Sequence, residues 1–208
     1  MTGFDEIFAD HRVMAILRGQ PPAETVALAG RLWDAGLDLV EVPIGSPEAV
    51  PALRAAVAAG AERGKRVGAG TVVTPEQVRV AAQAGAQYTV APGLDLTVLA
   101  ASLTAGLPHL PGVATATEVQ QARAAGCRWL KAFPAATLGP AWLRAITGPF
   151  PDLAIVATGG LRLADVAEYL AAGARVVALG TDLTGADPAT LLGLGQVPPG
   201  PRPGGAAS

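Results

Sequence analysis

Lys131 is the residue of this chain whose surroundings point most directly to chemistry. The chain has 15 basic residues, and only Lys65 and Lys131 are lysines. Lys131 lies in the segment 128–134, an apolar strand pattern that ends at a proline. Burial among apolar side chains disfavours an ammonium and lowers its pKa, and a neutral amine is a nucleophile. An exposed lysine on an edge strand is the alternative interpretation.

Glu41 is the second candidate catalytic residue. It lies between Val40 and Val42, in a segment that the apolar pattern predicts to be a buried strand. A buried carboxylate needs partners, and Lys131 and Arg18 are the cations that close other predicted strands. Such a carboxylate can act as a general acid/base, although a purely structural ion pair would place the same residues together.

Two glycine-rich turns are candidate phosphate sites. Gly159 and Gly160 follow one predicted strand, and Gly180 and Thr181 follow the next. Backbone amides in such turns attract phosphate, and the turns after the last two strands of a (β/α)8 barrel commonly bind it. Either turn alone could be only a tight connection, but both together favour phosphate binding.

The two histidines do not predict a metal site. His11 and His109 are far apart in the sequence and form no ligand pattern with carboxylates. Carbanion chemistry without a metal or another cofactor needs a different electron sink, which the iminium of a lysine Schiff base supplies. We therefore expect no metal and no cofactor.

A repeated glycine predicts the elements that position these residues. At six places a glycine follows a helical pattern and precedes an apolar segment by three residues: Gly36, Gly64, Gly85, Gly106, Gly126 and Gly173. Glycine at the C-terminus of a helix allows the left-handed conformation that turns the chain toward a strand. The repeat of roughly 20 to 25 residues matches one strand, one loop and one helix.

Counting these units predicts a single-domain (β/α)8 TIM barrel. The predicted strands are residues 13–18, 39–43, 66–70, 87–91, 108–111, 128–133, 153–157 and 176–179. Catalytic groups of such barrels gather where the strands end, which is where Arg18, Glu41 and Lys131 lie. An open dinucleotide-binding sheet is the alternative, but no Gly-x-Gly-x-x-Gly follows the first strand.

Composition limits the domain count, the partners and the compartment. With 208 residues, 50% of them hydrophobic and 15% charged, we expect one barrel over residues 1–195 and a disordered Pro/Gly-rich tail over 196–208. The formal net charge of -2 gives no support for nucleic-acid or membrane binding. A single cysteine, Cys127, and the absence of a secretory signal predict a cytoplasmic protein.

Five segments, in order along the chain, resemble the class I aldolases that cleave 2-keto-3-deoxy-6-phospho-sugar acids. The segments are residues 15–19 (AILRG), 40–47 (VEVPIGSP), 68–72 (GAGTV), 111–118 (PGVATATE) and 130–134 (LKAFP). The first and fourth segments are most similar to the 2-dehydro-3-deoxy-6-phosphogalactonate members. The resemblance implies cleavage to pyruvate and glyceraldehyde 3-phosphate, a homotrimer and no metal.

The resemblance also implies roles for individual residues. Lys131 would form the Schiff base, and Glu41 would be the general acid/base, directly or through a water. Arg18 would pair with the pyruvyl carboxylate and Thr71 would hydrogen-bond the same end. The phosphate would be held by Gly159, Gly160, Gly180 and Thr181, and Pro92 and Phe133 would line the pocket.

Three features depart from the galactonate pattern, from the gluconate pattern or from the family as a whole. Thr158 resembles the gluconate-type enzymes and would lie near substrate C4, where the two epimers differ. Ile44-Gly45 lacks the arginine that gluconate-type enzymes often place there, which leaves Arg18 for the carboxylate. The last helix is short, with residues 187–192 remaining.

Other functions remain open from the sequence. Within the family, the alternative is cleavage of 2-dehydro-3-deoxy-6-phosphogluconate or 4-hydroxy-2-oxoglutarate. A metal-free sugar-phosphate isomerase or epimerase would use an acid and a base without an imine. A catalytically silent phosphate-binding barrel would need neither Lys131 nor Glu41.

Overall fold

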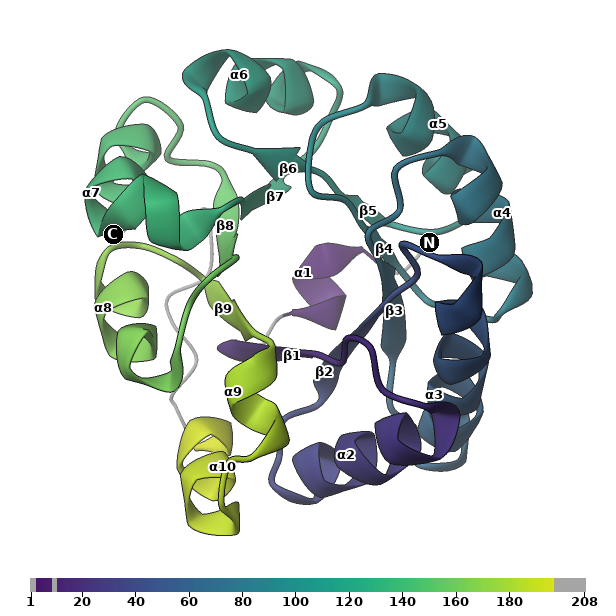
Figure 1. Ribbon diagram of the computed structural model, residues 1–208. Helices are drawn as coiled ribbons and strands as arrows, with labels where there is room; N and C mark the ends of the chain where they lie inside the picture. The colour runs from purple at the N-terminus through teal and green to yellow at the C-terminus, as the bar shows by residue number, and fades with distance from the viewer. Residues whose placement is uncertain (1–2, 9–10, 197–208) are drawn as a thin grey trace.

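Parallel β-strands form a barrel surrounded by helices in the computed structural model of the protein, which describes residues 3–8 and 11–196 (Figure 1). The sheet has nine strands in the order β5-β4-β3-β2-β1-β9-β8-β7-β6, and every neighbouring pair is parallel. Strands and helices alternate along the chain, so the predicted (β/α)8 barrel is confirmed.

The strands are short and lie close to the predicted positions. They are β1 (Val13–Ile16), β2 (Leu39–Pro43), β3 (Val67–Gly70), β4 (Thr89–Val90), β5 (His109–Leu110), β6 (Gly112–Val113), β7 (Trp129–Ala132), β8 (Ala154–Thr158) and β9 (Val176–Leu179). The six repeated glycines all have φ between 65° and 108°. This is the left-handed conformation that the repeat predicted at each helix end.

The helices follow the strands in order. They are α1 (Phe4–Ile7), α2 (Pro22–Asp34), η1 (Pro47–Ala49), α3 (Val50–Glu62), α4 (Pro75–Gln83), α5 (Leu96–Thr104), α6 (Ala116–Ala124), α7 (Ala135–Thr147), η2 (Leu163–Asp165), α8 (Val166–Ala171), α9 (Thr181–Thr184) and α10 (Pro188–Gly195). Helix α10 extends three residues beyond the short helix predicted for the C-terminal end. The predicted disordered tail, apart from Gln196, lies outside the described residues.

The fifth strand differs from the prediction because Pro111 divides it. Proline has no amide proton to donate, so regular pairing stops there and β5 and β6 form on either side. Strand β5 pairs with β4, whereas β6 pairs with β7. The amide of Lys131 donates to the Pro111 carbonyl at 2.8 Å. The two ends of the sheet therefore meet at one continuous segment, which closes the barrel.

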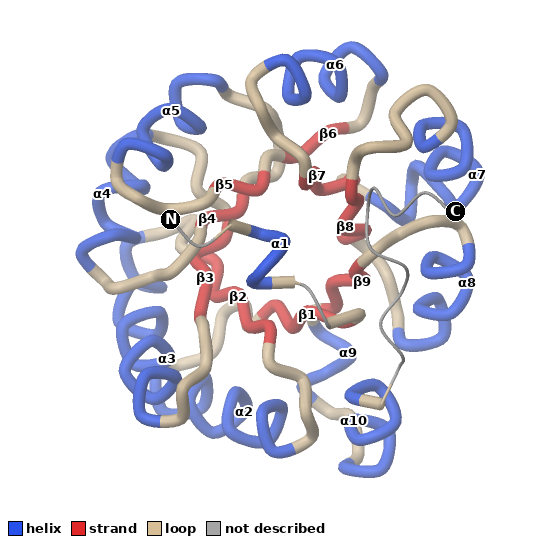
Figure 2. The backbone as a smooth tube through the Cα atoms, turned by 180° about the vertical axis from the view of Figure 1, so that it is seen from behind, coloured by secondary structure: helices blue, strands red, loops and turns tan. Residues whose placement is uncertain are grey.

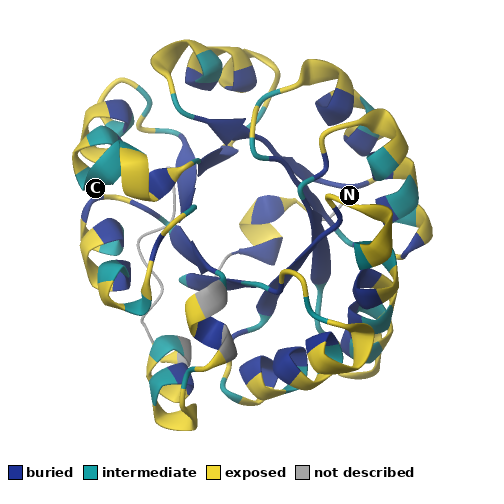
Figure 3. Cartoon of the chain, viewed as in Figure 1, coloured by how far each residue is buried: buried dark blue, intermediate teal, exposed yellow. Residues whose placement is uncertain are grey.

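Apolar side chains fill the two spaces on either side of the strands. Outward-facing residues such as Val40, Leu130 and Ile155 pack against the helices, including Leu32 of α2 and Leu53 of α3. In Figure 3 the strands are dark blue and the outer surfaces of the helices are mostly yellow. Within the described residues, no helix is long and apolar enough to cross a membrane.

Helix α1 closes one end of the barrel, as the view from behind shows (Figure 2). Its Phe4 and the following Phe8 contact Tyr88 edge-on, with ring centroids 6.0 Å apart, and Phe8 also contacts Trp129 at 5.0 Å. A side chain at Gly68 would overlap the Tyr88 ring, so glycine admits this tyrosine to the interior. The result is an apolar floor beneath the other end of the barrel.

A buried hydrogen-bonded chain fixes which nitrogen of His109 carries the proton. Ser102 donates to the Leu107 carbonyl at 3.1 Å, Thr89 lies 2.6 Å from Ser102, and His109 Nδ1 lies 2.8 Å from Thr89. Because the serine proton is used on Leu107, Thr89 donates to Ser102 and accepts from Nδ1–H. His109 therefore carries a proton on Nδ1, and burial lowers the pKa of the ring to about 4, which favours the neutral form at pH 7.

We expect His109 to weaken the fold selectively at acid pH. Its folded-state pKa of about 4 lies below the ordinary 6.5, so the unfolded chain binds more protons between these values and stability falls as the pH falls. Between pH 7 and 4 the wild type should lose about 3 kcal/mol more unfolding free energy than His109→Asn, which keeps a donor but does not titrate. Urea denaturation at several pH values measures this, and parallel profiles for the two proteins would contradict it.

Candidate functional site

Lys131 lies inside the barrel, near the end that α1 leaves open. Trp129, two residues earlier on β7, belongs to the apolar cluster of the interior, whereas Leu130 and Ala132 pack toward the helices. The alternation of a strand therefore directs Lys131 inward, one layer above Trp129. Only 5% of Lys131 is exposed, which excludes the alternative of a solvent-facing edge-strand lysine.

The surroundings of Lys131 favour its neutral amine. Burial lowers the pKa of Lys131, Glu41 opposes this, and the positive charge of Arg18 lowers it further. Lys131 Nζ lies 4.9 Å from the centroid of the Phe133 ring. An amine in this position is available as a nucleophile at a higher fraction than an exposed lysine.

Glu41 lies in the same interior layer, on β2. It is 1% exposed, and burial raises its pKa, while Lys131 and Arg18 lower it. Its Oε2 atom has no hydrogen-bond partner among the residues that the structure describes. The carboxylate lies over Gly70, where any side chain would overlap Oε1. Glu41 is thus a buried acid held within electrostatic reach of the amine.

Arg18 and Thr71 lie at the rim, where β1 and β3 end. The exposed Arg18 donates from Nη2 to Thr71 Oγ1 at 3.5 Å. Thr71 has φ 58°, and it is the one described residue other than glycine with a positive φ. This conformation is unfavourable for a β-branched residue, and such outliers concentrate at ligand-binding positions.

A cavity of about 370 Å³ opens at this rim and brings together most of the predicted site residues. Its lining includes Arg18, Lys131, Phe133, Thr158, Gly159, Gly160 and Gly180. Glu41, Thr71 and Pro92 do not border this cavity. The Pro92 carbonyl packs against Gly112 so closely that a side chain at position 112 would overlap it. Thr181 begins α9, next to Gly180.

The two glycine turns form the outer wall of the cavity. Gly159 and Gly160 have φ 100° and 76°, values that other residues rarely adopt. A side chain at Gly159 would also lie 2.8 Å from the Phe133 ring. Glycine at this position therefore lets the turn after β8 pack directly on the aromatic ring beside Lys131.

Six residues of the lining were not predicted from the sequence: Ile16, Gln20, Leu161, Arg162, Ala178 and Asp182. Strand alternation could have identified Ile16, the last residue of β1, and Ala178, the next-to-last residue of β9, as facing inward. Arg162 lies in the connection after β8 and Asp182 in the four-residue helix α9 after β9, and neither segment has a periodic pattern that indicates direction. Among residues 3–8 and 11–196, no group of three His, Cys, Asp or Glu side chains could hold a metal ion.

Comparisons with known proteins agree with this geometry. The family model described as KDPG and KHG aldolase matches residues 4–190. The 2-dehydro-3-deoxy-6-phosphogalactonate aldolase of Escherichia coli strain K12 is 39% identical over 172 residues, which are 82% of this chain and 83% of the relative.

Solved structures give the same result. A structure described as native KDPGal has a TM-score of 0.78 and 36% identity, covering 88% of this chain and 90% of that one. A KDPG aldolase from Legionella pneumophila, with pyruvate captured as a covalent carbinolamine, has a TM-score of 0.81 and 27% identity, covering 91% and 96%.

We expect Gly70→Ala to destabilise the protein through Glu41. The added methyl group overlaps Oε1, and such overpacking costs about 1–3 kcal/mol. In a Glu41→Ala background the same change should cost less than about 1 kcal/mol, because no carboxylate remains to be displaced. A double-mutant cycle by chemical denaturation measures this coupling, and Gly93→Ala, which meets open space, is the control. Equal costs in both backgrounds would mean that Glu41 does not occupy this position.

Proposed function

The chain belongs to the KDPG and KHG aldolase family and is a class I aldolase, and on this premise we propose that it cleaves 2-dehydro-3-deoxy-6-phosphogalactonate to pyruvate and D-glyceraldehyde 3-phosphate. The proposal rests above all on one observation, the buried amine of Lys131 in the same interior layer as the buried acid Glu41. The relative from Escherichia coli carries the galactonate name, which supports this substrate.

The reaction would begin with attack of Lys131 Nζ on the C2 ketone. Loss of water from the carbinolamine gives an iminium, and removal of the C4 hydroxyl proton breaks the C3–C4 bond. The bonding electrons move to the iminium and form an enamine, while glyceraldehyde 3-phosphate leaves. Protonation of C3 and hydrolysis of the imine release pyruvate and restore the amine.

Glu41 would transfer the protons in these steps. Burial raises its pKa, so the carboxyl group holds a proton more readily than an exposed glutamate and can donate it as well as accept one. Because Glu41 does not border the cavity, a water molecule between the carboxyl group and the substrate would carry the proton. Its reach to Lys131 supports a role in forming and hydrolysing the imine as well.

The other site residues would bind the two ends of the substrate. Arg18 would pair with the carboxylate next to C2, and Thr71, within hydrogen-bonding distance of Arg18, would contact the same end. The turns of Gly159, Gly160, Gly180 and Thr181 would hold the phosphate. Phe133 would form one wall beside the amine, and Pro92 would support the opposite rim.

We further propose a cytoplasmic homotrimer. Two exposed apolar side chains, Val73 and Leu96, follow the neighbouring strands β3 and β4, which supports a contact between subunits on this side. The one cysteine, Cys127, is a free thiol with its pKa raised by burial to about 11, as suits a reducing compartment.

Lys131→Ala should abolish cleavage while the protein still folds. The imine cannot form without the amine, so we expect turnover to fall by at least about a thousandfold. Borohydride added with pyruvate should attach a pyruvyl group to the wild type and not to Lys131→Ala, as measured by mass spectrometry. Lys65→Ala removes the chain's other lysine and is the matched control, which should still be labelled. Cleavage by Lys131→Ala at near wild-type rate would exclude the Schiff base, whereas a wild type that neither cleaves the substrate nor takes up a pyruvyl group would favour an acid/base isomerase or epimerase.

The two C4 epimers should be distinguished by kcat/KM. We expect the galactonate epimer to be cleaved in preference to the gluconate epimer. Thr158 borders the cavity, and Thr158→Val removes its hydroxyl with little change in volume. Loss of one neutral hydrogen bond should reduce activity on the gluconate epimer about fivefold and leave the galactonate epimer nearly unchanged. A wild-type preference for gluconate would overturn the proposed substrate in favour of the alternative.

A further inference from the structure

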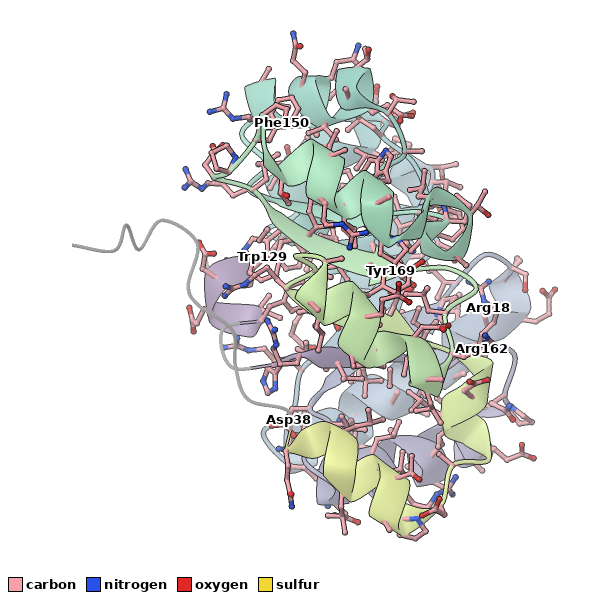
Figure 4. All side chains as sticks on the ribbon, turned by 90° about the vertical axis from the view of Figure 1, so that its left-hand side faces the viewer. Arg18, Asp38, Trp129, Phe150, Arg162 and Tyr169 are labelled. Carbon is pink, nitrogen blue, oxygen red and sulfur yellow. The ribbon has the colours of Figure 1, made fainter. Side chains whose placement is uncertain are left out.

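Arg162 is the basic residue of the cavity lining that the proposed mechanism does not use. It borders the cavity two residues after Gly160, on the connection between β8 and η2. Figure 4 shows Arg18 and Arg162 at the same end of the barrel, opposite α1. The charged residues that border this cavity, among those described, are Arg18, Lys131, Arg162 and Asp182.

The backbone at Arg162 is held firmly. Its amide donates to Asp165 Oδ2 at 2.7 Å, and the next amide, that of Leu163, donates to Asp182 Oδ2 at 3.1 Å. The second bond joins the connection after β8 to the one after β9. Both glycine turns that would hold the phosphate are therefore tied together next to Arg162.

The guanidinium of Arg162, by contrast, has most of its hydrogen-bonding capacity free. The side chain is 74% exposed, and its ion pair with Asp165 is long, at 3.7 Å from Nε to Oδ2. A guanidinium has five N–H donors arranged to bind two oxygens at once, which is the geometry of a phosphate. Its long, flexible stem starts from a fixed backbone position at the cavity.

The charges at this end of the cavity favour a cation beside the phosphate. Lys131 lies at the base of the cavity on β7, and Arg18 would bind the carboxylate of the substrate. The carboxylate of Asp182 repels a phosphate dianion, although it is engaged with the Leu163 amide. Arg162 is then the cation that remains to offset both the phosphate and Asp182.

We propose that Arg162 is a further substrate-binding residue that contacts the phosphate and makes the enzyme select phosphorylated over unphosphorylated 2-keto-3-deoxy acids. This inference rests on the proposed function and extends it to one more residue. The contact would form equally in the bound substrate and in the transition state, because the phosphate is remote from the bond that breaks. Its loss should therefore change KM and leave kcat in place.

Arg162→Ala tests this inference. We expect KM for 2-dehydro-3-deoxy-6-phosphogalactonate to rise about tenfold, as for loss of a charge-assisted hydrogen bond, with kcat within about twofold. KM for unphosphorylated 2-dehydro-3-deoxygalactonate should not change. Arg162→Lys should reverse part of the rise in KM, because lysine keeps the positive charge but cannot donate two parallel hydrogen bonds to the phosphate. Arg54→Ala, which removes one positive charge from the exposed surface of α3, is the matched control and should behave as the wild type.

Two results would overturn the inference. One is an unchanged KM for the phosphorylated substrate, and the other is an equal rise for both substrates, which would indicate a general effect on the cavity. Trapping of pyruvate on Lys131 by borohydride reports the proposed function separately. Arg162→Ala should be trapped as efficiently as the wild type, because pyruvate has no phosphate. A wild type that is not trapped would instead count against the Schiff base.

Discussion

The structure depends on keeping one layer of the barrel interior out of water. Lys131 and Glu41 both lie in that layer, and burial shifts their pKa values in opposite directions, down for the amine and up for the acid. The two shifts bring the groups closer to a state in which a proton can move between them or to a substrate. Exposure of either group would return it to its ordinary charge, so desolvation is the condition on which the chemistry rests.

The rest of the barrel can be understood as the means of maintaining that condition. Helix α1 and the rings of Phe8, Tyr88 and Trp129 close the interior from below and separate Lys131 from solvent on that side. Glycines make this packing possible, since Gly68 admits the tyrosine ring and Gly70 admits the carboxylate. The missing side chains of β3 are therefore as necessary to the site as the functional groups themselves.

Much of this arrangement could be predicted from the sequence, because it follows from periodic patterns. The repeated glycines located the helix ends, the apolar residues around Glu41 predicted a buried carboxylate, and the scarcity of lysine singled out Lys131. Side-chain packing produces no periodic pattern in the sequence. The close contacts of Glu41 with Gly70 and of the Pro92 carbonyl with Gly112 were therefore found only in the structure. The division of the fifth strand at Pro111 depended on which neighbour each half pairs with, a tertiary property.

Arg162 and Asp182 were not predicted from the sequence, and the reason also explains how this fold can vary its substrate specificity. Residues of the interior layer are fixed by strand register, and a change there disturbs both the packing and the pKa values of the reacting groups. Residues in the connections after the strands are fixed only by local hydrogen bonds, such as those of Arg162 and Leu163 to acidic side chains. Such positions can change with little cost to the core, so a barrel of this kind can retain its reaction while the rim alters which end groups it accepts. The same freedom removes any periodic signal from the rim, and for that reason the residues that choose the substrate are harder to predict than those that react with it.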